Sequence, residues 1–325
     1  MLLFLSSLRL HTLSSYLFSD CFLSSYGSAV YSARGLLDSM ACINPKPISW
    51  TEVKALSFDI YGTLIDRNAA LVASARDTAL GPYLPVSDQE LLQGIAKHST
   101  DVESEKPKMK KSELNAEGLV RYGHELGIIG EGKGMASEEV AREASRQHGA
   151  AFGRYPAFSD TVSFARCRQS WIAFANASAA RCHLRLSRHY KLIPISNIDH
   201  ASYNATLSGP LKGCNFATSY IAKDIGSYKP SLNNFHYLLS RLKSDFGVEG
   251  EQHVHVAQSL FHDHEPCREM GIRSVWVDRY DVLGQRGLSE SDVLQEFDIQ
   301  LRVRSLGELA DLVDEAFHAK RAAAT

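Results

Sequence analysis

Short apolar runs alternate with amphipathic stretches along most of this chain. Each run has the length of a buried strand, and the stretches between them, such as 231–244 and 264–270, repeat apolar residues at helical spacing. The final helix is predicted over 305–321, with Leu306, Leu309, Leu312 and Val313 on one face. Such alternation predicts an α/β fold with a doubly wound parallel sheet. The predicted strands are 53–60, 191–196, 215–221, 253–257, 274–277 and 299–303.

The interval between the first two predicted strands is too long for a simple crossover connection. Residues 68–187 are therefore expected to form an inserted helical cap domain over the carboxyl edge of the sheet. The core domain is then expected to comprise 51–67 and 188–325. Helices are predicted inside the inserted segment at 88–98, 112–126 and 137–152, from the spacing of their Leu, Ile and Val residues.

Two segments do not fit this scheme. Residues 1–50 are expected to be an extension outside the fold, Ser-rich and weakly similar to a transit peptide, and Met40 is an alternative start. Residues 166–183 interrupt what otherwise reads as one helix leading into the strand at Lys191. This segment is interpreted either as an insertion, for example retained intron sequence, or as a real and longer helical hairpin.

Composition narrows the class of protein. The 325 residues are 44% hydrophobic and 22% charged, which is usual for a soluble globular protein. A net charge of −2 provides no basic surface for nucleic acid, and the apolar N-terminal run is too short to span a bilayer. None of the six cysteines forms a C-x-x-C pair, which favours reduced thiols. We expect a cytoplasmic protein, or a mitochondrial one if the N-terminal extension is native. The sequence does not decide whether the protein forms a homodimer.

Four segments at the ends of predicted strands carry candidate chemistry. Ligands of open α/β sheets bind at that edge. Asp59 follows the first strand and, with an ordinary pKa near ~3.9, would be ionised and nucleophilic. Ser196 and Asn197 follow the second strand and offer a hydroxyl and an amide, whereas Lys229 offers a cation. Asp263 follows the fourth strand. Taken singly, each could instead be a helix cap or a surface residue.

In this order the segments F-D-I-Y-G-T-L, I-S-N, Y-K-P and S-L-F-H-D resemble the four motifs of the haloacid dehalogenase (HAD) superfamily. The closest resemblance is to its type II 2-haloacid dehalogenases, including fungal-like members. It implies a Rossmann-like core and a metal-independent hydrolase of carbon–halide bonds. Asp59 would form an aspartyl ester, Lys229 would balance negative charge, and Asp263 would orient Lys229 or activate water. The implied substrate-binding residues for a small carboxylate are Tyr61, Thr63, Ser196, Asn197 and Ser259.

Departures from the family pattern leave alternatives open. A magnesium-dependent HAD phosphatase needs a second Asp two residues after the nucleophile and an Asp in the fourth motif, where this chain has Tyr61 and Gln258. The arginine expected near 91–98 is absent, and Phe235 and Leu260 replace a tyrosine and an asparagine. A catalytically weak binding or regulatory protein is the third hypothesis. No metal is predicted, and no organic cofactor either, because no G-x-G-x-x-G follows a strand.

Overall fold

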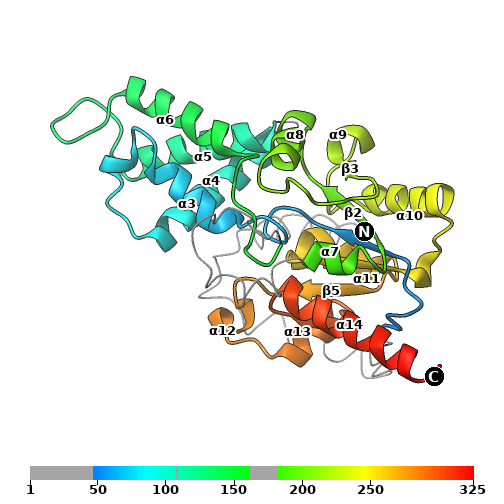
Figure 1. Cartoon of the computed structure of the whole chain (residues 1–325). Coiled ribbons are helices and arrows are strands. Elements are labelled where there is room, and N and C mark those ends of the chain that lie inside the picture. The colour runs from blue at the N-terminus through cyan, green and yellow to red at the C-terminus, as the bar shows by residue number, and fades with distance from the viewer. Residues whose placement is uncertain (1–46, 107–108, 162–181) are drawn as a thin grey trace, which may run out of the picture. The chain divides into compact units, whose positions relative to one another are not determined.

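The structure is a computed structural model that describes residues 47–106, 109–161 and 182–325 (Figure 1). Nearly all of the predicted N-terminal extension 1–50, and nearly all of the 166–183 insertion, lie outside the described residues. Within the described ranges, no helix combines the length and apolarity needed to cross a bilayer.

Six parallel strands form one sheet in the order β3-β2-β1-β4-β5-β6. The predicted α/β fold with a doubly wound parallel sheet is therefore confirmed. Three strands occupy the predicted residues, and the third is much shorter than predicted because only its last two residues pair with β2. The strands are β1 (Ala55–Phe58), β2 (Lys191–Ser196), β3 (Tyr220–Ile221), β4 (His253–Ala257), β5 (Ser274–Val277) and β6 (Leu301–Val303).

The strand order reverses direction at β1. This strand lies between β2 and β4, with Ala55 opposite Lys191 on one side and His253 on the other. Connections that leave β1 and its two neighbours diverge at this point, which opens a crevice at the carboxyl ends of the strands. Asp59, the residue directly after β1, therefore lies where such sheets bind ligands.

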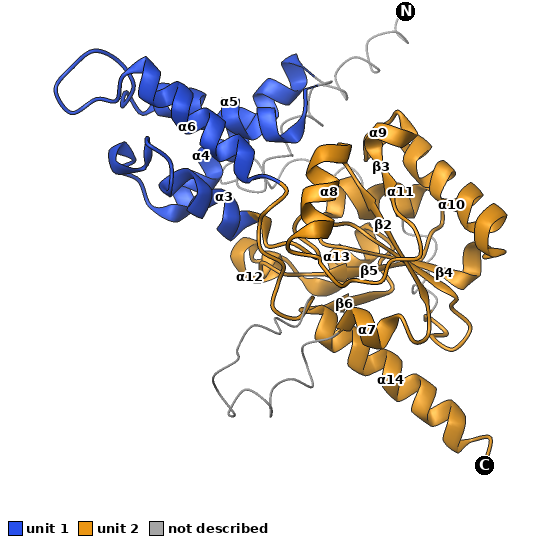
Figure 2. Ribbon diagram, turned by 45° about the horizontal axis from the view of Figure 1, so that its top comes forward, with its two compact units in different colours: residues 1–43, 68–152 blue, residues 44–67, 153–325 orange. Residues whose placement is uncertain are grey.

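Helices cover both faces of the sheet. On one face α10 (Leu232–Phe246) contributes Phe235, Leu238 and Leu242 to a buried cluster with Ile193 and Cys267. Within the described residues α7 packs on α14, and neither helix contributes to the α10 cluster (Figure 2). The remaining elements of this unit are α7 (Cys182–Leu186), α8 (His200–Ser208), α9 (Ala222–Ile225), η4 (Gly250–Gln252), η5 (Leu260–His264), α11 (Glu265–Glu269), α12 (Val282–Arg286), α13 (Glu290–Glu296) and α14 (Leu306–Ala322).

The contacts divide the chain into two compact units, coloured separately in Figure 2. One is helical and covers Asn68–Phe152; the other contains the sheet and covers 47–67 and the chain from Gly153 onward. The helical unit comprises most of α3 (Arg67–Arg76), then η2 (Gly81–Tyr83), α4 (Asp88–Glu105), α5 (Lys111–Glu125) and α6 (Glu138–Ala151).

Close packing of α4 on α5 explains a glycine in the middle of a helix. A Cβ at Gly94 would lie 2.3 Å from the ring of Tyr122, so only glycine lets the ring approach the α4 backbone. Ser87 and Glu90 form a capping box that starts α4 at the predicted residue. The helix runs to Glu105, past its predicted end, because Ser99 and Val102 continue its buried face.

We expect Leu238→Ala to lower the free energy of unfolding by about 2–5 kcal/mol, because the side chain is fully buried in the α10 cluster. Leu288→Ala is the matched control, since Leu288 is 38% exposed, and it should change stability by no more than about 0.5 kcal/mol. Urea unfolding followed by tryptophan fluorescence measures both. Equal losses in the two variants would contradict the burial assigned to α10.

Candidate active site

The turn after β1 presents Asp59 at the edge of the sheet. Asp59 N still donates to Val256 O of β4 at 3.2 Å, so the backbone leaves the sheet only beyond this residue. Gly62 then adopts a φ of 97°, a conformation that favours glycine, and its N donates to Ile65 O at 2.8 Å. A Cβ at Gly62 would also lie 3.2 Å from Gln258 Oε1. The Asp–Ile–Tyr–Gly–Thr sequence is thus a tight turn that directs one carboxylate out of the strand end.

A single ammonium group joins the two carboxylates predicted from distant segments. Lys229 Nζ donates to Asp59 Oδ1 at 2.8 Å, to Asp263 Oδ1 at 2.6 Å and to Ile195 O at 3.1 Å. Lys229 has 2% of its side chain exposed, Asp263 1% and Asp59 10%. The three residues whose catalytic roles were predicted from sequence are therefore brought together, with Asp59 the most accessible of them.

Charges within this triad shift the pKa values of Lys229 and Asp59. Burial opposes a charge on Lys229, but Asp263 and Asp59 outweigh it and raise the pKa of the ammonium above its ordinary value. Burial raises the pKa of Asp59, Lys229 acts in the opposite direction, and the charge of Asp263 adds to the rise. Two carboxylates therefore share one cation, so the three groups together carry a net negative charge when all of them are ionised.

Thr63 holds the second oxygen of the proposed nucleophile. Its hydroxyl donates to Asp59 Oδ2 at 3.2 Å and accepts from Gln258 N at 2.9 Å. Arg279, which sequence reasoning missed, donates from Nε and Nη2 to Thr63 O at 3.1 and 2.9 Å, and from Nη1 to both oxygens of Asp160. The turn that carries Asp59 is therefore tied to the ends of β4 and β5.

Asn197 positions Lys229 through the backbone. Its amide oxygen accepts from Lys229 N at 2.7 Å, and its amide nitrogen donates to Lys229 O at 2.8 Å. Ser196 ends β2 directly before it and is buried. The I-S-N segment thus lies beside the triad, where Asn197 contacts the Lys229 backbone.

Two other predicted substrate-binding residues direct their hydroxyls elsewhere. Tyr61 OH lies 2.8 Å from Thr206 Oγ1 on α8, and burial raises the pKa of the phenol. Ser259 Oγ accepts from His262 N at 3.2 Å and caps the π-helical turn η5. Asp263 therefore does not cap this turn, and its carboxylate is left for Lys229 and His255.

Sequence reasoning also missed three buried polar residues behind the triad. Ser57 Oγ lies 2.7 Å from His253 Nε2 and 2.7 Å from His255 Nδ1, and His255 Nε2 lies 2.9 Å from Asp263 Oδ1. A signal for them exists in the H-V-H-V-A strand, where polar residues alternate within an otherwise buried run.

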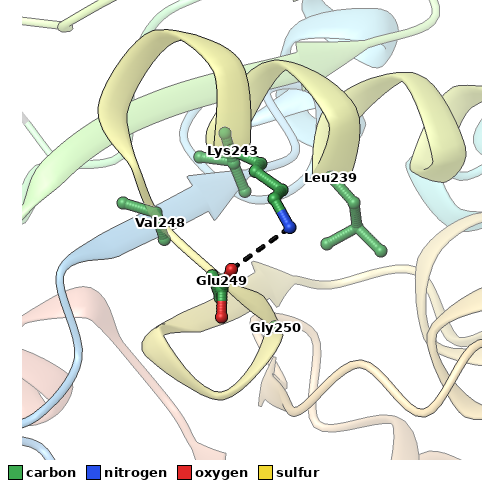
Figure 3. A pocket seen from close by; sticks show the side chains of 6 residues that line it. Leu239, Lys243, Val248, Glu249 and Gly250 are labelled. Carbon is green, nitrogen blue, oxygen red and sulfur yellow. Dashed lines mark ion pairs between the residues drawn. The ribbon is translucent and has the colours of Figure 1, made fainter.

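The sheet-containing unit has a hollow of about 310 Å³ near the end of α10 (Figure 3). It is lined by Leu239, Leu242, Lys243, Val248, Glu249 and Gly250. The Lys243–Glu249 ion pair at its rim spans 3.2 Å between exposed side chains. None of its lining residues belongs to the Lys229 triad or to the residues that hold it.

Searches of family models and of curated proteins find no match. Among solved structures, the chain is similar to a dehalogenase with an intermediate complex, at a TM-score of 0.58, 17% identity and coverage of 80% of this chain and 97% of that one. It is also similar to L-2-haloacid dehalogenase from Xanthobacter autotrophicus with chloropropionic acid covalently bound, at a TM-score of 0.55, 17% identity and coverage of 81% and 98%. A putative HAD-hydrolase from Bacillus subtilis bound to magnesium matches at 0.54, 16% identity and 80% and 98% coverage.

This chain has the same fold as these solved structures. At such identities the likeness establishes the fold alone. It does not support the assignment to the fungal-like branch that the motifs suggested. Asp59, Lys229 and Asp263 meet at the carboxyl edge of the sheet, which is where open α/β sheets bind ligands.

We expect Lys229→Met to lower the free energy of unfolding by about 3–5 kcal/mol at neutral pH, because it leaves two buried carboxylates without their cation. Asp59→Asn should cost far less, or stabilise, since a neutral Lys229–Asp263 pair remains. Lys243→Met is the control for losing an ion-paired lysine at the surface, and should cost less than about 1 kcal/mol. A Lys229 variant as stable as the Lys243 variant in urea would refute the buried triad.

Proposed function

We propose that this protein is a hydrolase of the 2-haloacid dehalogenase type, acting on a small carboxylate through an Asp59 ester. The observation that carries the proposal is the Lys229 ammonium, which contacts Asp59 Oδ1 at 2.8 Å and Asp263 Oδ1 at 2.6 Å. A partly accessible carboxylate that is hydrogen-bonded to a buried cation suits a nucleophile. A cytoplasmic location and a homodimer remain predictions.

The proposed reaction has two steps. One oxygen of Asp59 attacks the halogen-bearing carbon, a carbon–oxygen bond forms, and halide leaves with the electrons of the broken bond. Water then attacks the carbonyl carbon of the Asp59 ester and gives a proton to Asp263. The bond between that carbon and the substrate oxygen breaks, and the oxygen takes up one proton to become a hydroxyl. One water is consumed; halide and one proton are released, and Asp59 is ionised again.

Lys229 serves both steps through its charge. It holds Asp59 against protonation before the attack, and it compensates Asp263 once Asp59 has become a neutral ester. Thr63 limits the rotation of Asp59 by donating to Oδ2 at 3.2 Å. Positioned donors of this kind need no reorganisation as charge moves, which is how polar sites lower barriers.

The residues around Asp59 disfavour the magnesium phosphatase. Its leaving alcohol needs a general acid two residues after the nucleophile, yet the hydroxyl of Tyr61 contacts Thr206 and burial raises its pKa. Gln258 replaces the usual carboxylate ligand, and Gly62 packs beside its amide oxygen. The described residues bring no three His, Cys, Asp or Glu side chains together at a site that could hold a metal ion.

The identity of the halide or leaving-group pocket is a separate matter. In the 91–98 stretch, where the family has an arginine, Lys97 Nζ and His98 Nε2 both contact Glu125 Oε2, at 2.9 and 3.0 Å. Phe235, in place of the family tyrosine, is fully buried with its ring against His255. These differences favour a small carboxylate substrate whose leaving group is held by other residues. They are also consistent with a binding protein, which the assay below distinguishes.

Incubation of the full chain with L-2-chloropropionate should release halide equally with and without EDTA. In a single turnover in H₂¹⁸O with enzyme in excess, the label should appear in the Asp59 carboxylate, because water attacks the ester carbonyl. Asp59→Asn should abolish release. Lys243→Met, altered only at the exposed rim of the hollow, should retain it.

Label found directly in the product hydroxyl would refute the ester. Magnesium-dependent release of phosphate from a generic phosphate ester would establish the phosphatase instead. A folded protein with neither activity would support the binding hypothesis.

The rate at low pH tests the electrostatics of the nucleophile. Burial raises the pKa of Asp59 above 3.8, so the carboxylate takes up a proton at a higher pH than an exposed aspartate does. We expect kcat/KM to fall as pH decreases, with the midpoint above 3.8, within the range where circular dichroism shows an intact fold. A rate that stays constant down to pH 4 would contradict the raised pKa.

A further inference from the structure

Three buried polar side chains form a connected group beneath the candidate active site. Ser57 lies on β1, and His253 and His255 lie on β4; all three are fully buried. The parallel register places Ser57 opposite His255, so their side chains leave the same face of the sheet. That face otherwise packs in the apolar cluster around α10, where the ring of Phe235 lies edge-on to His255 at 5.4 Å.

Such a position is costly for polar groups unless each finds a partner. Here the partners form a series of hydrogen bonds that ends at the triad. His253 Nε2 and His255 Nδ1 each lie 2.7 Å from Ser57 Oγ, and His255 Nε2 lies 2.9 Å from Asp263 Oδ1. His264, another buried histidine nearby, instead contacts Ser274 Oγ and Ala257 O.

The protonation states of the two histidines fix the donor and acceptor of every hydrogen bond in this series. Burial, and then the Lys229 ammonium, lowers the pKa of His255 to about 3, and burial lowers that of His253 to about 3. Both rings are therefore neutral near pH 7, with one N–H each. A carboxylate bound to Lys229 only accepts, so His255 must donate from Nε2 and its Nδ1 must accept from Ser57. Ser57 then accepts from His253 Nε2–H.

The contact between His255 and Asp263, the last in this series of hydrogen bonds, determines how Asp263 is oriented. Its Oδ1 accepts from both His255 and Lys229, whereas no group within the described residues hydrogen-bonds to its buried Oδ2. Lys229 alone cannot fix the rotation of this carboxylate, because the same ammonium also serves Asp59 and Ile195 O. His255 adds the second, directional contact, and Oδ2 is left as the acceptor for a proton.

We propose that Ser57, His253 and His255 are positioning residues that hold Asp263 with Oδ1 on Lys229 and Oδ2 ready to take the proton of the hydrolytic water. This inference rests on the proposed function and adds to it a specific requirement of the second step. Formation of the Asp59 ester needs only Asp59 and Lys229, whereas its hydrolysis also needs the orientation of Asp263.

The two steps can be separated by rapid kinetics. His255→Leu removes the donor to Asp263 and should give a halide burst of one equivalent, followed by ester hydrolysis about 10- to 100-fold slower than in wild type, the cost of a misplaced catalytic group. The ester should accumulate on the Asp59 peptide in mass spectra. His255→Gln, whose amide can still donate, should recover most of the rate, and Ser57→Ala should show the same defect in milder form.

A variant with general structural damage would behave differently. His148→Leu is the matched control, because His148 is also fully buried and also contacts a serine, Ser74, at 2.8 Å. It should lose stability without accumulating ester. If His255→Leu slows both steps equally, or hydrolyses the ester at the wild-type rate, the positioning role is refuted.

Histidine ¹⁵N–¹H correlation spectra test the chain without any substrate. Both His253 and His255 should carry their proton on Nε2 at pH 7, and Ser57→Ala should alter the Nδ1 signal of His255. A proton on His255 Nδ1 would refute the positioning role of these residues without affecting the proposed function. A wild-type protein that shows the expected tautomers but releases no halide would refute the proposed function. It would also refute the role of these hydrogen bonds in ester hydrolysis.

Discussion

One buried ammonium group between two carboxylates is the interaction on which the candidate site depends. Lys229 has almost no contact with solvent, yet it stays charged because Asp59 and Asp263 outweigh the cost of its burial. Either carboxylate alone would give a closed ion pair with little chemical use. With two, the cation is shared, and the more exposed carboxylate, that of Asp59, is the one we propose as the nucleophile.

The rest of the core makes this arrangement rigid. Asn197 holds the Lys229 backbone from the end of β2, Thr63 holds Asp59 from the turn after β1, and Arg279 holds that turn from the end of β5. Each support comes from a different strand of one parallel sheet. Small shifts of the triad would therefore need several strand ends to move together, which a packed core resists.

The residues next to the triad bear on which chemistry the proposed function assigns to the site. Tyr61 replaces an acid that a phosphatase needs, and its hydroxyl contacts the interior at Thr206. Gln258 replaces a metal ligand and lies against Gly62. The Ser57–His253–His255 group instead gives Asp263 a defined orientation without adding charge to the site. These features support the proposed displacement at carbon followed by hydrolysis of an ester.

Sequence alone was enough for the parallel sheet, most strand bounds and the position of Asp59, since these follow from local periodicity and from turn residues such as Gly62. It also suggested Lys229 and Asp263 as candidates after strands, but their roles came only from a resemblance, because their segments are far from Asp59 in the chain. The tertiary structure decided which polar atoms meet: Asn197 on a backbone, Tyr61 on Thr206, and His255 on Asp263. Hydrogen bonds between distant segments depend on strand register and side-chain direction, and no local pattern of residues contains either.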